Sequence, residues 1–137
     1  MPALQPTTDQ MRRFAKSGHD GPIVMVNLLK FRDKAQYQPE DPEYGDDITG
    51  AEAYARYNRD LGAFTGESQI DISVVYEAVV EGFFIGDGDW DKVLLVRYPS
   101  RQHFLAMTAD PRYQAAHRHR AAALIHQDLI ETHPAED

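Results

Sequence analysis

Residues 22–31 constrain the fold more than any other part of the sequence. The stretch PIVMVNLLKF is an apolar run, rich in β-branched residues and bounded by turn-forming residues. Such a run is typical of a strand that is buried on both faces, because no alternation separates a core side from a solvent side. The sequence therefore predicts a central strand here.

The other elements follow from periodicity and capping residues. Thr49 and Glu52 have the spacing of a capping box, and Ser100 and Asp110 are suitable N-caps, the latter followed by Pro111. The predicted elements are a short helix over 8–16, a long loop over 32–48, an amphipathic helix from 49, a partly alternating strand over 71–85, a turn at 86–89, a strand over 91–98, helices after 100 and 110, and a last strand over about 124–132.

The order helix, β, α, β, β, α, β predicts an α+β protein with the ferredoxin-like βαββαβ layout. In this layout both main helices cover one face of an antiparallel four-stranded sheet. We expect one domain over residues 1–137, with an amino-terminal helical extension at 1–20 and a core at 21–132.

The second face of the sheet needs its own cover. The strand at 22–31 is apolar on both sides, and each large apolar side chain left in water would forgo roughly 1.5–3 kcal/mol. Only the short amino-terminal helix is left over to shield that face. The sequence therefore predicts a homodimer in which two sheets pack together, a dimeric α/β barrel.

Composition excludes several classes of function. The net charge of −8 disfavours nucleic acid, and no apolar segment has the length of a signal peptide or a membrane span. The absence of cysteine excludes disulfides, thiolate zinc sites and a cysteine nucleophile. We expect a cytoplasmic protein that contacts neither nucleic acid nor membrane.

Three stretches carry a resemblance to a known family: VMVNLLKF at 24–31, WDKVLLVRYPSRQHFLAM at 90–107, and DPRY at 110–113 with HR at 119–120. Together they resemble the domain-of-unknown-function family numbered 1330, within the dimeric α/β-barrel superfamily. The resemblance implies a ferredoxin-like subunit whose sheets pair in a dimer, and it supplies no reaction. Wider relatives include cofactor-independent oxygenases, lactone isomerases and haem-handling enzymes, a likeness of fold only.

Five polar or aromatic residues occupy positions where a ligand could be held. Asn27 interrupts an apolar strand, Tyr54 and Tyr57 share the inner face of their helix, Trp90 opens the third strand, and Arg97 lies on the Val93 and Leu95 face. Each also has a structural interpretation. These are a hydrogen-bonded amide for Asn27, core packing for Tyr54 and Tyr57, a hairpin anchor for Trp90, and an ion pair with Glu77 or Glu81 for Arg97.

The segment His117–Arg120 is the candidate for catalysis. A helical count at 100° per residue puts His117 and Arg120 on the inner face and turns Arg118 and His119 away, whereas the resemblance implies His119 and Arg120. Functionally, Arg120 would hold a carboxylate or enolate and a neighbouring histidine would move a proton. The alternative for Arg120 and for the histidines is a structural role, in which each side chain is hydrogen-bonded within the fold.

The sequence supports no metal site and no cofactor. His117 and His119 diverge on a helix, and the aspartates at 87, 89 and 91 lack the pattern of a calcium loop. The leading hypothesis is a small-molecule enzyme of the cofactor-independent oxygenase or isomerase type, acting in a pocket between sheet and helices. The alternatives are a non-catalytic small-ligand-binding or stress-associated dimer, and a haem-handling protein.

Overall fold

The computed structural model describes residues 5–16, 18 and 20–135 of the chain. Its elements follow the predicted order. They are α1 (Thr8–Lys16), β1 (Ile23–Phe31), α2 (Gly50–Glu67), β2 (Ser73–Val79), β3 (Lys92–Tyr98), α3 (Arg101–Ala109), α4 (Pro111–Ala123) and β4 (Leu124–Thr132).

The helices begin at the residues that the sequence marks as caps. Thr49 and Glu52 form a reciprocal capping box at the start of α2. The side chain of Ser100 accepts from the backbone of His103 at the start of α3, and Asp110 caps α4, which has proline in its first turn. The predicted capping is confirmed at all three positions.

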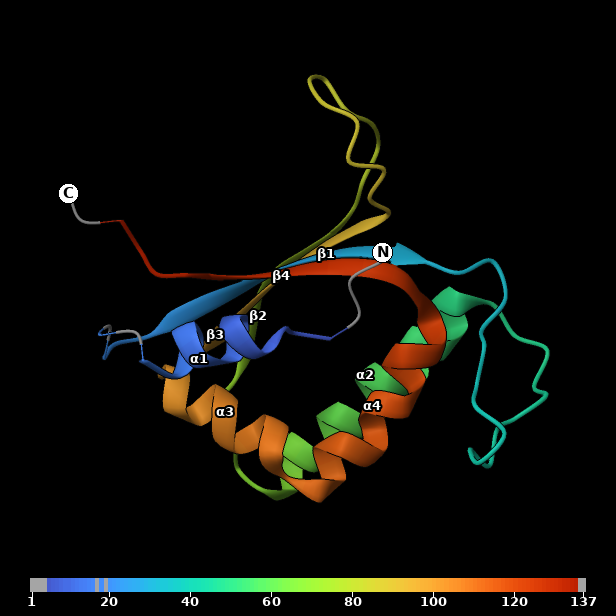
Figure 1. Cartoon of the computed structure of the whole chain (residues 1–137), viewed down its shortest axis with the longest axis horizontal. Coiled ribbons are helices and arrows are strands. Elements are labelled where there is room, and N and C mark those ends of the chain that lie inside the picture. Colours follow the sequence, from blue (N-terminus) through green and yellow to red (C-terminus); the bar gives the residue numbers. More distant parts are fainter. Residues whose placement is uncertain (1–4, 17, 19, 136–137) are drawn as a thin grey trace.

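The four strands form one antiparallel sheet in the order β2-β3-β1-β4, with α2, α3 and α4 on one face (Figure 1). This is the ferredoxin-like arrangement that the sequence predicts. On the helix side, alternate residues of β1 and β3 are buried and pack against α2 and α4. The core therefore lies between the sheet and the helices.

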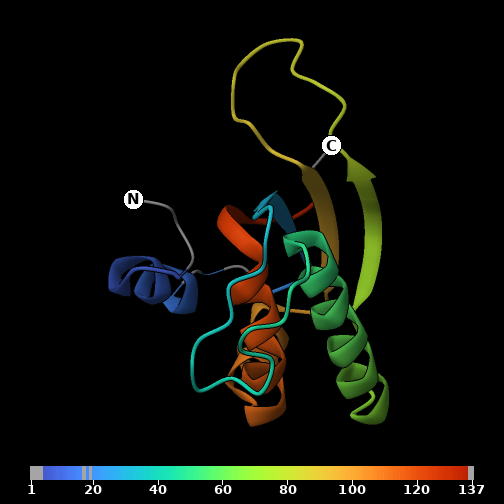
Figure 2. The ribbon, with the colours of Figure 1, turned by 90° about the vertical axis from the view of Figure 1, so that its right-hand side faces the viewer.

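No helix formed by the described residues lies over the opposite face of the sheet, called here the open face (Figure 1). It is formed by the other alternate residues of the strands, including Val24, Val26, Leu28, Val93, Leu95, Tyr76 and Ile130. The amino-terminal helix α1 does not cover it, because Phe14 of α1 packs on Phe104 of α3 with ring centroids 5.4 Å apart. Figure 2 shows α1 beside the domain.

The β2–β3 connection differs from the predicted tight hairpin. Strand pairing ends at Val79 and resumes at Lys92, so residues 80–91 form a long arm in place of the turn predicted at 86–89. A register shift between Val74 and Tyr76 also puts these two residues on opposite faces, whereas regular alternation would place residues two apart on the same face. The strand predicted over 71–85 was therefore too long, and its alternation was wrong.

Within the residues that the structure describes, no helix combines the length and the apolarity that crossing a membrane would require.

Candidate functional site

A buried guanidinium lies at the centre of the space between sheet and helices. The side chain of Arg120, from α4, is only 5% exposed. Its Nη2 donates to Oδ1 of Asn27 at 3.0 Å, and the Asn27 amide group donates to the main-chain oxygens of Met25 and Leu94 at 3.2 and 3.1 Å. Asn27 therefore anchors Arg120 to the two central strands.

Tyrosines surround this guanidinium. Its carbon lies 5.8 Å from the ring centroid of Tyr57, and the Tyr57 ring is 5.4 Å from that of Tyr54 and 6.4 Å from that of Tyr113. We call the following residues the Arg120 cluster: Asn27, Tyr54, Tyr57, Tyr98, Tyr113, His117 and Arg120. Four elements contribute to it. They are β1, α2, β3 and α4.

The cluster holds a positive charge that no acid balances. Within the described part of the chain, no carboxylate forms an ion pair with Arg120, and its Nε has no hydrogen-bond acceptor. A guanidinium stays protonated when buried, and leaving such a charge unpaired costs several kcal/mol. The site therefore favours an additional negative group next to Arg120.

Burial also sets the protonation of the groups around Arg120. It raises the pKa of Tyr54 and of Tyr57, so both phenols keep their protons at neutral pH. Burial and then the positive charge of Arg120 lower the pKa of His117, which therefore stays neutral at pH 7. The cluster thus offers phenolic donors and a neutral imidazole beside a fixed cation.

A groove of about 390 Å³ opens next to the cluster, between α2 and the ends of β2 and β3. Its lining includes Phe31, Tyr54, Asn58, Val79, Asp91 and Lys92. Tyr54 belongs to both the groove and the cluster, because its ring packs on that of Tyr57, which lies beside Arg120. The volume suits a small molecule.

His119 belongs to a different network from the Arg120 cluster. It is 2% exposed, with Nδ1 2.6 Å from the hydroxyl of Tyr37 and Nε2 3.2 Å from Oδ2 of Asp60. Because Nε2 faces a carboxylate, we assign its proton there, and Nδ1 then accepts from Tyr37. Burial, followed by the charge of Arg118, lowers the pKa of His119.

The helical count correctly turned Arg118 and His119 away from the inner face of α4, but it did not predict that His119 is buried. The loop between β1 and α2 folds over the outer side of α4. There Tyr37 covers His119, and Glu43 accepts hydrogen bonds from Nε and Nη2 of Arg118. A helical count shows which side chains point toward the sheet and which point away from it. It contains no information about a loop that covers the outer side of the helix.

Trp90 and Arg97 lie away from the Arg120 cluster. Trp90 precedes β3 and packs on His126 of β4, with ring centroids 4.8 Å apart. Arg97 pairs with Val24 in the sheet register and lies on the open face. Its expected ion pair with Glu77 is absent, because Glu77 lies on the helix side and pairs there with Lys92.

The structure thus brings together Asn27, Tyr54, Tyr57, His117 and Arg120 from the predicted site. Sequence reasoning missed Tyr98, although it shares the buried side of β3 with Leu94 and Val96. It also missed the Tyr37 and Asp60 partners of His119, for which the sequence carries no signal. Within the described residues, no group of three or more metal-ligating side chains occurs.

The sheet order and helix placement define this chain as a protein of the ferredoxin-like α+β class. It is similar to a solved protein of unknown function, RPA0582 from Rhodopseudomonas palustris, with 35% identity over 100% of both chains and a TM-score of 0.85. The structure of the methylated RPA0582 protein gives 37% identity, 99% and 98% coverage and a TM-score of 0.85. The chain therefore belongs to the family of the RPA0582 protein.

A more distant solved structure shows the fold alone. It is a dabb family protein with a ferredoxin-like fold from Mesorhizobium loti, 12% identical, with 85% of this chain and 99% of that chain covered and a TM-score of 0.56. No protein-family model matches the sequence, and a search of curated proteins finds no match.

Proposed function

We propose that this protein is an enzyme of the cofactor-independent oxygenase or isomerase type, acting on a small carbonyl-bearing or aromatic compound. The observation that carries the proposal is the buried Arg120, for which the described residues provide no acid partner and beside which Tyr54 lines an adjoining groove. An anionic substrate, or an enolate formed from it, would supply the missing negative charge.

The chemistry assigned to the cluster is proton abstraction next to a carbonyl group. His117 is the proposed general base, since its lowered pKa keeps it neutral and able to accept a proton at pH 7. Arg120 and the Tyr54 hydroxyl would stabilise the developing enolate oxygen. Asn27 positions Arg120, and Tyr57 supports it from the other side. His119 has a structural role in this proposal, because both of its ring nitrogens already contact Tyr37 and Asp60.

A non-catalytic small-ligand binder is the second candidate. It is favoured by the finding that neither His117 nor Arg120 lines the 390 Å³ groove, nor the 350 Å³ groove between α2 and α3. A ligand in the larger groove would then reach Tyr54 without meeting the proposed base.

Ligand binding is testable with a charged and a neutral probe of the same shape. We expect benzoate to raise the melting temperature of the protein and benzamide to leave it unchanged, because only benzoate supplies a negative charge. Tyr54→Phe should weaken benzoate binding about tenfold, the effect of one lost hydrogen bond to a charged group. Tyr44→Phe, at an exposed loop position, is the matched control.

Catalysis is testable by hydrogen exchange at carbon. Phenylpyruvate has an acidic carbon next to its carbonyl, and we expect the protein to accelerate exchange of that proton in heavy water, followed by nuclear magnetic resonance. His117→Gln should abolish the acceleration and retain benzoate binding. Binding without accelerated exchange would select the non-catalytic alternative, and absence of both would reject the proposed site.

Three further predictions accompany this proposal. We propose that the open faces of two copies pair in a homodimer, since the face is apolar and no helix covers it. The family numbered 1330 and a cytoplasmic location also stay predictions from the sequence.

A further inference from the structure

The arm at residues 80–91 is fixed firmly at its base. Val80 donates to the carbonyl of Asp91 at 2.9 Å, and Asp91 in turn donates to Leu29 of β1 at 2.8 Å. The Asp91 carboxylate accepts from the backbone of Phe31 at 2.9 Å and pairs with Lys30 at 3.3 Å. These contacts give the arm a defined direction relative to the sheet.

Trp90 fixes the same base from the open-face side. Its ring packs on His126, which lies opposite Lys30 on the open face. A Cβ atom on Gly88 would come within 2.6 Å of the indole nitrogen, so the chain approaches the Trp90 ring more closely than a larger residue would permit. The arm therefore leaves the sheet on the side away from the helices, as Figure 1 shows.

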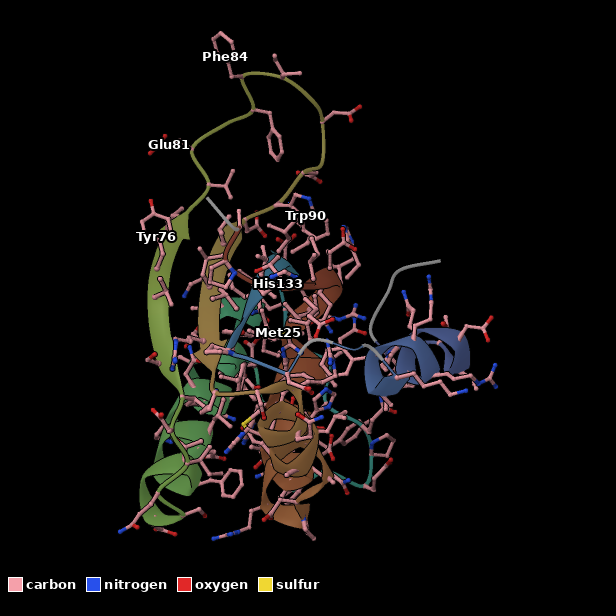
Figure 3. All side chains as sticks on the ribbon, turned by 90° about the vertical axis from the view of Figure 1, so that its left-hand side faces the viewer. Met25, Tyr76, Glu81, Phe84, Trp90 and His133 are labelled. Atoms are coloured by element: carbon pink, nitrogen blue, oxygen red, sulfur yellow. The ribbon has the colours of Figure 1, made fainter. Side chains whose placement is uncertain are left out.

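The far end of the arm is strongly apolar and exposed. Phe84 is 101% exposed, Ile85 86% and Phe83 42%, and Figure 3 shows Phe84 at the outer tip with Trp90 near the base. Fully exposed neighbouring phenylalanine and isoleucine side chains are unfavourable in water and mark a contact surface.

We infer that the arm is a clasp that buries Phe84 and Ile85 against a second copy of this chain. The inference rests on the proposed homodimer and extends it, since the clasp adds a contact outside the paired sheets. The arm and the open face lie on the same side of the molecule, so one twofold-related copy covers both at once.

The exposed area agrees with this assignment. The arm tip, together with Val75, Tyr76 and Ile130, exposes on the order of 700 Å² of side chain. A stable protein–protein interface buries about 800 Å² on each partner. The highly exposed Phe84 and Ile85 therefore add to the apolar area that the sheet face offers to such an interface.

Charge also favours a second copy. Arg97 and Asp128 lie on the open face on opposite sides of β1, and neither has an ion-pair partner among the described residues of its own chain. Two copies related by a twofold axis can pair such opposite charges in both directions. A membrane is disfavoured as the occupant, because Glu81, Asp87 and Asp89 flank the tip and anionic lipid repels them.

The test compares self-association of the full chain and of a tip variant. In sedimentation equilibrium we expect F84D/I85D to raise the dimer dissociation constant at least thirtyfold, with an unchanged circular dichroism spectrum. The reason is that charges replace the two exposed apolar side chains that the clasp would bury. Y44D, at a loop residue that is 61% exposed, should leave it unchanged. An unaffected tip variant would overturn the clasp and leave the dimer standing, whereas a monomeric parent protein would overturn both.

A second measurement reports on the tip itself. The chain contains no cysteine, so F84C accepts a single polarity-sensitive fluorophore, and Y44C provides the exposed control. We expect the emission from position 84 to shift to the red on dilution through the dimer dissociation constant, and that from position 44 to stay constant. A shift produced instead by phosphatidylglycerol vesicles, with none on self-association, would reject the clasp and assign the tip to membrane contact.

Discussion

At the scale of single residues, the molecule depends on a few positions where only one side chain fits. Gly50 is one of them. Its amide donates to the carbonyl of Arg32 at 3.0 Å, and a Cβ atom there would lie 2.3 Å from that oxygen and 2.5 Å from the carbonyl of Ala123. The start of α2 therefore touches the backbone at the ends of β1 and α4.

We expect Gly50→Ala to destabilise the protein by about 3 kcal/mol, because backbone oxygens cannot move aside as a flexible side chain would. Urea unfolding followed by circular dichroism measures this difference. Gly62→Ala, in the same helix with open space around its Cβ position, is the matched control and should stabilise by up to about 1 kcal/mol. Equal effects of the two substitutions would show that close approach at Gly50 is not the cause.

Arg120 illustrates what a residue-level pattern can and cannot give. Its inward direction followed from its spacing with Tyr113 on α4, and the structure confirms it. The sequence did not predict that Arg120 lacks a balancing acid among the described residues, because an acidic side chain could reach Arg120 from any element packed against α4. This absence is the basis of the proposed function.

At the scale of elements, the loop between β1 and α2 is held on the helices by ion pairs. Glu43 accepts from Arg118 of α4 at 2.9 and 2.8 Å, and Asp46 pairs with Arg56 of α2 at 2.9 Å. The sequence predicted a long loop with no periodicity. Its attachment to α4 buries His119, although the helical count turned this residue away from the sheet.

The Glu43–Arg118 pair predicts a dependence of stability on pH. The hydrogen bonds from Arg118 lower the pKa of Glu43 from 4.5 to about 2. Because the folded-state pKa is the lower one, the pair stabilises the fold above about pH 4.5, and this contribution is lost as the pH falls towards 2.

We therefore expect Glu43→Gln to lower the free energy of unfolding by about 1–2 kcal/mol at pH 7, a value reduced for partial solvent screening. The difference from the parent protein should shrink as the pH falls from 4.5 to 2. Chemical denaturation at a series of pH values measures it. Glu40→Gln, at an exposed position of the same loop, should show no such dependence. A constant difference at every pH would contradict the assigned ion pair.

At the scale of the whole molecule, stability should depend on assembly. If two copies pair through their open faces, dimerisation favours the folded state by mass action. We expect the melting temperature to rise over about a hundredfold increase in protein concentration, as measured by scanning calorimetry. The F84D/I85D variant should show a smaller rise. A melting temperature independent of concentration would count against the proposed homodimer.

The sequence by itself determined the order of the elements, the caps of α2, α3 and α4, and the side of α2 and α4 that faces the core. It did so because these properties depend on residues a few positions apart, where spacing and local hydrogen bonding act directly. β1 and β4 were predicted almost to the residue. β2, in contrast, ends at Val79, where the arm begins, and it contains a bulge that no local pattern marks.

Only the tertiary structure decided which side chains meet. It placed Asn27, Tyr54 and Arg120 together, and it moved Trp90 and Arg97 to the open face. Contacts of this kind join residues up to 93 positions apart. Such contacts depend on how whole elements pack against one another. The periodicity of one element predicts which of its faces is buried, but not which residues of other elements contact that face.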